Sequence, residues 1–156
     1  MSRRDVSGVV NFQYAYQKIV DLKSSEKTQA EWLLSAAFGK LQSEEATLES
    51  LLKERELWLG RLQEASLTSV PLSELLIMQH YVDYIDSSIA SKRIDVRKAQ
   101  QYVDDSRSVL SDKMKDEKVW QKSKERAHDR FRVMTQMKEQ YELDELATVR
   151  FMTSAP

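Results

Sequence analysis

The stretch RLQEASLTSVPLSELLIMQHY, Arg61–Tyr81, contains the single proline that precedes the last residue of the chain. Apolar residues recur every three or four positions on both sides of Pro71, which is the pattern of an amphipathic helix. Proline suits the first turn of a helix, and the hydroxyls of Ser66, Thr68 and Ser69 are candidate caps for a helix start. The stretch therefore predicts the end of one long helix and the start of a second.

Two interleaved series of residues, each repeating every seven positions, run through the segment before the turn. The first series is Leu34, Leu41, Leu48, Arg55 and Leu62. The second series is Ala37, Glu44, Leu51, Trp58 and Ala65. The positions between them are mostly Glu, Gln, Lys, Ser and Arg, so one face is apolar and the rest is polar. Residues 12–65 are therefore expected to form the first helix.

The segment after the turn keeps the seven-residue repeat without an insertion or a deletion. One series is Leu75, Val82, Ile89, Val96, Val103, Leu110, Glu117, Lys124 and Phe131. The partner series is Met78, Ile85, Lys92, Ala99, Ser106, Lys113, Trp120, Ala127, Met134 and Tyr141. Several positions hold Lys, Glu or Ser, so the apolar seam is imperfect. The repeat predicts a left-handed supercoil, with residues 71–148 as the second helix.

The connector between the two helices, residues 66–70, is short. A connector of about five residues between amphipathic helices favours antiparallel neighbours. Charged residues make up 31% of the 156 residues, whereas only 3 Gly and 2 Pro are present, which is typical of long helices. We expect a single all-α domain over residues 1–156, a long two-helix antiparallel coiled coil, or helical hairpin. Its second helix should overhang the first from about residue 124 to residue 152.

Several kinds of chemistry lack the residues that they need. The chain has no cysteine, which excludes disulfides, thiolate metal sites and cysteine nucleophiles. His80 and His128 lie far apart, and no GxxxxGK[ST], GxGxxG or HExxH motif is present. We therefore expect no enzyme, no metal site and no cofactor. The sequence has no signal-peptide core and no stretch as long as a membrane span, so we expect a cytoplasmic protein.

Three regions contain aromatic, apolar or basic side chains that coiled-coil pairing alone does not explain. Rings and large apolar side chains crowd the turn, and others gather near the N-terminus and along the expected overhang. The third region, residues 113–138, holds nine Lys or Arg and four Asp or Glu. Exposed rings and unpaired apolar stripes are typical of protein interfaces. A generic coiled-coil adaptor is one alternative, and a basic helix that binds nucleic acid is a weaker one.

Three stretches have a composition and order of their own. They are FQYAYQKIVDLKSSEKTQAEW (Phe12–Trp32), VPLSELLIMQHYVDYIDSSI (Val70–Ile89) and KEQYELDELATVRF (Lys138–Phe151). The first stretch starts with aromatic residues, and the second has a short link before a helix rich in Tyr. The third contains Asp-Glu-Leu-Ala at Asp144–Ala147, which is the most distinctive segment of the three. With these stretches in this order, the chain resembles the FliJ family of the bacterial flagellar export apparatus, and the match covers nearly the whole chain.

The resemblance implies both a fold and a role. The family fold is an antiparallel coiled coil, similar to the paired terminal helices of the central stalk in rotary ATPases. The end that carries both termini would insert into the hexameric flagellar export ATPase and activate it. The turn would contact the cytoplasmic domain of the export-gate membrane protein, and the chain would also assist export chaperones. This implies a peripheral location at the inner face of the cell membrane, with no membrane insertion and no nucleic acid as partner.

The resemblance also implies which residues make these contacts. The residues expected to bind the export gate are Leu51, Trp58, Tyr81, Ile85 and Ser88. Glu54 departs from the family pattern, since it places a charge where an aromatic residue would fit. The apolar residues expected to bind the ATPase are Tyr14, Ile19 and Leu22, with Phe131, Met134 and Tyr141 opposite them. The basic residues expected to meet acidic residues in the pore of the ring are Lys122, Lys124 and Arg126.

Overall fold

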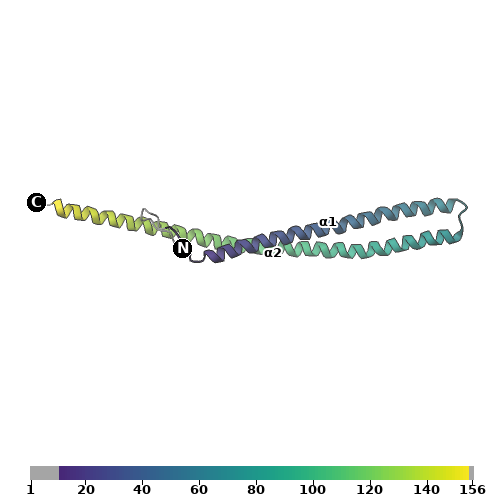
Figure 1. The fold of residues 1–156 in the computed structure, drawn as a ribbon, viewed down its shortest axis with the longest axis horizontal. Helices are drawn as coiled ribbons and strands as arrows, with labels where there is room; N and C mark the ends of the chain where they lie inside the picture. The colour runs from purple at the N-terminus through teal and green to yellow at the C-terminus, as the bar shows by residue number, and fades with distance from the viewer. Residues whose placement is uncertain (1–10, 155–156) are drawn as a thin grey trace. The chain divides into compact units, whose positions relative to one another are not determined.

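The computed structural model describes residues 11–154, which form two long helices (Figure 1). Helix α1 spans Gln17–Leu67, and helix α2 spans Leu72–Ser154. The chain reverses direction between them, so the helices lie antiparallel on either side of the turn. The predicted all-α helical hairpin is confirmed.

The two helices differ from their predicted bounds at the ends away from the turn. Helix α1 begins at Gln17 rather than near residue 12, and α2 continues to Ser154 rather than ending near residue 148. The segment before α1, Asn11–Tyr16, is here called the strap. Its side chains contact α2, and α1 begins directly after it. Helix α2 continues because it contains neither glycine nor proline to interrupt it.

The turn is closed by backbone hydrogen bonds. The amide of Thr68 donates to the carbonyl of Ala65 at 3.3 Å, and the amides of Glu74 and Leu75 donate to the carbonyl of Pro71. Pro71 therefore sits immediately before α2 and accepts its first hydrogen bonds. The capping prediction was wrong for Ser66 and Thr68, because both hydroxyls donate backward to carbonyls near the end of α1.

The contacts of the chain cluster into two compact units. The hairpin unit, Thr28–Asp112, contains the turn and most of the apolar core. Its buried apolar residues are Ala30, Ala37, Ala65, Val82, Ile85, Ile89, Ala99 and Val103. All eight belong to the predicted heptad series or continue it by one step. Seven-residue spacing therefore places these side chains in the seam between the helices.

A charged pair interrupts the apolar seam of the hairpin unit. Lys92 Nζ donates to Glu44 Oε2 at 2.8 Å, and Lys40 reaches the other oxygen of Glu44 at 2.8 Å. Hydrogen bonds from Lys40 and Lys92 lower the pKa of Glu44, and the bond to Glu44 raises the pKa of Lys92. The stabilisation from Glu44 is therefore lost as pH falls through its folded-state pKa. Ala37 lies seven residues before Glu44, and Ala99 lies seven residues after Lys92. The antiparallel register that pairs Glu44 with Lys92 therefore places Ala37 opposite Ala99.

The terminal unit contains residues 11–27 of the first segment and residues 113–154 of α2. Its seam is mostly ionic. Lys27 Nζ lies 3.1 Å from Glu117 Oε1, and Lys113 Nζ lies 3.3 Å from Glu26 Oε2. The hydrogen bond from Lys113 lowers the pKa of Glu26, and that from Lys27 lowers the pKa of Glu117. Val20 is the buried apolar residue of this unit.

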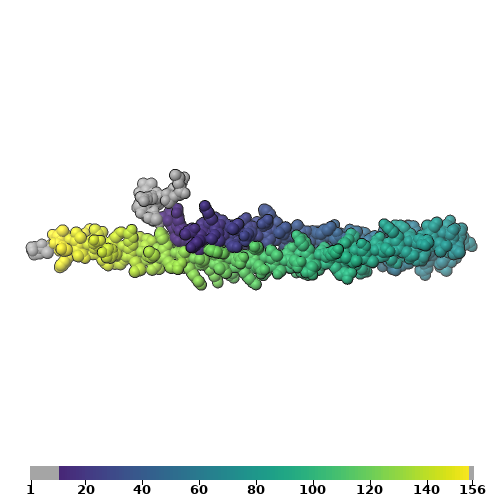
Figure 2. Space-filling view, turned by 90° about the horizontal axis from the view of Figure 1, so that it is seen from below, coloured from purple at the N-terminus to yellow at the C-terminus, as the bar shows by residue number. Residues whose placement is uncertain are grey.

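The last part of α2 extends past the start of α1 within the terminal unit (Figure 2). Every residue of Gln136–Ser154, here called the tail, is exposed. The overhang was expected from about residue 124, but the strap partly covers α2 as far as Phe131, so full exposure begins later. Within residues 11–154, neither helix offers an apolar stretch that could cross a membrane.

Candidate functional site

Three aromatic rings form a cluster near the turn, here called the tip cluster: Trp58 of α1 with Tyr81 and Tyr84 of α2. The centroids of Trp58 and Tyr81 lie 4.7 Å apart at an angle of 60°, and those of Tyr81 and Tyr84 lie 6.2 Å apart, nearly parallel. The guanidinium of Arg61 lies 5.0 Å above the Trp58 ring. Trp58 and Tyr81 are half-buried, whereas Tyr84 is exposed. The cluster thus presents a partly accessible aromatic surface.

Glu54 supports the tip cluster. The hydroxyl of Tyr81 donates a hydrogen bond of 2.5 Å to Glu54 Oε1. This bond raises the pKa of Tyr81, because ionising the phenol would remove the donor and bring two negative charges together. The residue that departed from the family pattern in the sequence therefore positions Tyr81. Sequence reasoning missed this role because the pairing depends on the register between the two helices.

The five residues expected to bind the export gate fall into different environments. Ile85 is 1% exposed and belongs to the hairpin core, so its side chain is not part of the accessible surface. Leu51 and Ser88, like Trp58 and Tyr81, are half-buried. Sequence reasoning missed further exposed apolar residues around the turn: Leu67, Leu72, Leu76 and Ile77. Their positions outside the two heptad series were the signal that could have identified them.

The residues expected to bind the ATPase also lie in different environments. The Tyr14 hydroxyl hydrogen-bonds with Ser123 Oγ at 2.7 Å, and Phe131 packs beneath Phe12, with ring centroids 5.4 Å apart. Ile19 is half-buried and Leu22 is exposed. Met134 and Tyr141 are each 69% exposed, since they lie beyond the start of α1. The structure therefore places Tyr14 and Phe131 within the terminal unit and leaves Met134 and Tyr141 uncovered.

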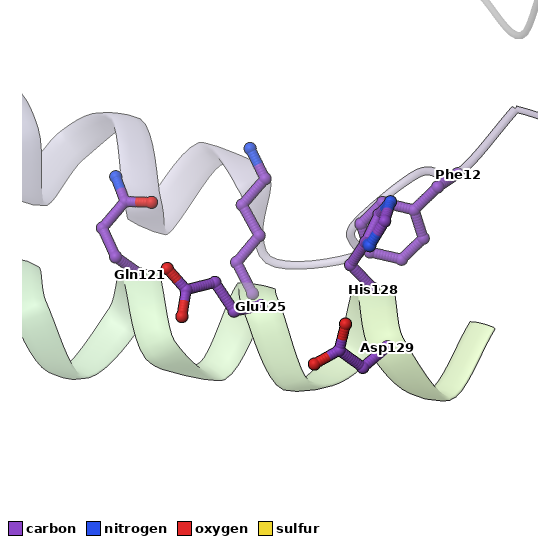
Figure 3. Close-up of a pocket in the computed structure, with 6 residues that line it drawn as sticks. Phe12, Gln121, Glu125, His128 and Asp129 are labelled. Carbon is purple, nitrogen blue, oxygen red and sulfur yellow. The ribbon is translucent and has the colours of Figure 1, made fainter. Parts of the chain in front are cut away.

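An open groove lies where the strap crosses α2 (Figure 3). Its lining residues are Phe12, Gln121, Lys124, Glu125, His128 and Asp129. The rings of Phe12 and His128 meet edge to face, with centroids 5.0 Å apart. Lys124 is half-buried here, while the other predicted basic contacts, Lys122 and Arg126, are exposed on neighbouring turns. A groove with both signs of charge beside an aromatic floor suits contact with another protein surface.

The tail carries large apolar side chains on all of its sides. Met137 and Tyr141 are four positions apart and share one side of α2. Leu143 and Leu146 follow Tyr141 by two and five positions, which places them on the opposite side of a helix with about 3.6 residues per turn. Val149, Phe151 and Met152 are exposed as well. These apolar side chains are spread around the tail among polar and charged ones, and exposed apolar side chains that gather in this way are typical of protein interfaces.

These features define a class of protein: an antiparallel helical hairpin that exposes aromatic and apolar side chains near its turn and along its tail. The model of the flagellar FliJ protein family matches residues 12–155. The chain therefore belongs to the FliJ family, a family of non-catalytic components of flagellar protein export. The resemblance that the sequence stretches indicated is confirmed.

A solved structure shares the fold. It is that of CT670 from Chlamydia trachomatis, a protein assigned as a YscO homologue, with a TM-score of 0.56. The similarity covers 92% of this chain and 97% of CT670 at 16% sequence identity, so it concerns the fold alone. No curated protein matches the sequence.

The hydrogen bond between Tyr81 and Glu54 gives a pH-dependent prediction. In an ultraviolet titration of the tyrosines, Glu54→Gln should lower the pKa of Tyr81 toward its ordinary value, because a neutral amide repels the phenolate less. Since the pKa is raised in the folded state, the bond stabilises the fold below the ordinary tyrosine pKa. That stabilisation is lost as pH rises through the raised value.

Glu56→Gln, an exposed neighbour on α1, is the matched control and should leave the titration unchanged. Tyr81→Phe assigns the signal, because it should remove the part of the titration that changes in Glu54→Gln. An identical titration curve in the wild type and Glu54→Gln would show that the two side chains do not interact in solution.

Proposed function

We propose that this chain is a non-enzymatic component of the flagellar export apparatus that binds and activates the hexameric export ATPase. The observation that carries this proposal is the tail, which is exposed throughout and carries large apolar side chains on more than one side. Membership of the FliJ family supplies the flagellar context, and it favours this function over a generic adaptor.

The shape of the required partner follows from the tail. A second helix or a flat surface would cover only one side and leave either Tyr141 or Leu143 in water. A partner that surrounds the tail can cover both sides at once, and burial of apolar area is favourable at roughly 25 cal/mol per Å². The central pore of a ring-shaped hexamer has this geometry. We therefore assign the tail, with Met134, as the part of the chain that enters the ring.

The basic stretch of α2 extends this surface toward the turn. Residues 113–138 hold nine Lys or Arg against four Asp or Glu. Lys122 and Arg126 are exposed, and Lys124 lies beside the groove below the strap. Complementary charge mainly sets the rate and orientation of association. These cations would guide the hairpin into a pore with acidic residues at its mouth.

Activation of the ATPase would be allosteric. A two-helix hairpin lacks six-fold symmetry, so it cannot make the same contacts with six identical subunits. A ligand shifts a conformational equilibrium only through unequal interactions with its states. Unequal contacts around the ring would favour closure of some nucleotide-binding interfaces over others, and so couple hairpin binding to hydrolysis. The nucleotide chemistry would belong to the ring, with no catalytic residue from this chain.

The tip cluster is proposed to bind the cytoplasmic domain of the export-gate protein. Its accessible part comprises Trp58, Tyr81 and Tyr84, with Ile77 exposed two turns earlier on α2. Partly exposed rings supported by a hydrogen bond suit an interface anchor. Because α2 carries both surfaces, the chain would link the ATPase to the gate at the inner face of the membrane. The same surfaces are available for export chaperones.

The ATPase proposal is tested by reversing charge on the basic stretch. Lys122→Glu, Lys124→Glu and Arg126→Glu together should lower stimulation of the cognate export ATPase by about ten-fold or more, because steering and pore contacts become repulsive. The matched control reverses Arg93, Lys98 and Arg97, three exposed cations of the hairpin unit, to Glu. Equal stimulation by both variants and the wild type would rule out the charge contact.

The gate proposal is tested by truncating side chains near the turn. Ile77→Ala with Tyr84→Ala should weaken binding to the cytoplasmic domain of the gate protein and leave ATPase stimulation intact. Both residues are exposed, so the free energy of unfolding should change by no more than about 0.5 kcal/mol per substitution.

The control for this experiment is Ile94→Ala with Tyr102→Ala, an exposed pair of the same residue types elsewhere on α2. It should bind the gate domain as the wild type does. If both double variants bind with wild-type affinity, the tip cluster is not the gate-binding surface.

A further inference from the structure

The strap lies across the part of α2 that continues into the tail. The Tyr14 hydroxyl hydrogen-bonds with Ser123 Oγ, the Tyr16 ring lies 6.1 Å from that of Trp120, and Phe12 packs on His128 and Phe131. Trp120, Ser123 and Phe131 are all half-buried, whereas Gln136–Ser154 are exposed. The strap therefore shields a stretch of α2 directly next to the surface proposed to enter the ring.

The first turns of α1, which follow the strap, pair with α2 through weak contacts. Between Gln17 and Lys27 the seam is formed largely by ion pairs, and the side chains in these pairs are 19–53% exposed. Partly exposed ion pairs contribute little to stability, since water screens them. The first turn of α1 also lacks an acidic residue that would favour its N-terminal dipole.

The hairpin unit is held differently. Val82, Ile85 and Val103 are at most 2% exposed in its seam, so its pairing rests on buried apolar contacts. Local opening of a protein begins where buried apolar contacts are fewest. The start of α1 should therefore separate from α2 without loss of the hairpin.

We propose that the strap and Gln17–Lys27 form an autoinhibitory latch that covers part of the ring-binding surface in the free protein. The latch and a surrounding partner would compete for the side chains of α2 beside the tail, from Trp120 to Phe131, a stretch that includes the cations proposed to meet the mouth of the pore. A ring that encloses α2 this far must displace the strap, so the affinity of the free protein is reduced by the fraction that is closed. This inference rests on the proposed function, because it assigns a regulatory contact to the same surface.

Locking the latch tests the proposal directly. The chain has no cysteine, so Tyr14→Cys with Ser123→Cys can be joined by a bismaleimide that contains a reducible disulfide. The linked protein should bind the cognate ATPase ring at least about ten-fold more weakly than the same protein after reduction. The reduced sample is its own control for the two substitutions. Equal affinity before and after reduction would overturn the latch.

Releasing the latch should have the opposite effect. Phe12→Ala removes the ring that packs on His128 and Phe131, so it should raise affinity for the ATPase several-fold. Phe38→Ala is the matched control, because that ring contacts Arg107 within the hairpin unit, and it should not change affinity. Weaker binding by Phe12→Ala would show that the strap is a ring contact rather than a latch.

Hydrogen exchange of the free protein separates failure of the latch from failure of the proposed function. Amides of Gln17–Lys27 should exchange faster than those of Val82–Val103, and Phe12→Ala should accelerate only the former. Equal protection of the two segments would overturn the latch whatever the ATPase does. If Gln17–Lys27 opens as expected but neither the wild type nor Phe12→Ala binds the ring, the proposed function fails instead.

Discussion

The unequal lengths of the two helices are the constraint on which the other features depend. Helix α1 has 51 residues and α2 has 83, and both are paired outward from the same turn. Because the short connector fixes antiparallel pairing, α1 and the strap end before α2 does. Among the described residues, the tail is thus left exposed, with large apolar side chains on more than one side. The proposed enclosing partner would cover these side chains, and membership of the FliJ family supplies the context of flagellar export.

The residues in the seam between the helices differ between the two units. The hairpin unit is joined by buried aliphatic residues, with Glu44 and Lys92 as a charged layer that disfavours other registers. The terminal unit is joined by ion pairs and by the rings of the strap. Buried apolar pairing supports the tip cluster near the turn, whereas the ionic pairing near the termini is the basis for the opening proposed above. The difference in pairing follows from which residue types occupy the heptad positions.

The sequence predicted the fold well and the sites only in part. Heptad spacing located both helices, the turn and the core, including Glu44 and Ser106 at buried polar positions, because a seven-residue repeat fixes which side chains meet. Contacts outside the apolar seam were missed: the strap, the backward hydrogen bonds of Ser66 and Thr68, and the hydrogen bond from Tyr81 to Glu54. These depend on the register between distant segments or on local turn geometry, which periodicity does not encode. The same limit explains Ile85, whose heptad position indicated its burial although the resemblance had suggested a binding role.

Deletion of the tail is the most direct test of the account. A chain that ends at Thr135 keeps the turn, the seam of the hairpin unit and the strap, and the described residues that it loses, Gln136–Ser154, are all exposed. We predict that its thermal unfolding, followed by circular dichroism, will have the midpoint of the full chain apart from the lost helical signal. The truncated chain should no longer stimulate the cognate export ATPase. Full stimulation by the truncated chain would contradict the assignment of the tail as the element that enters the ring.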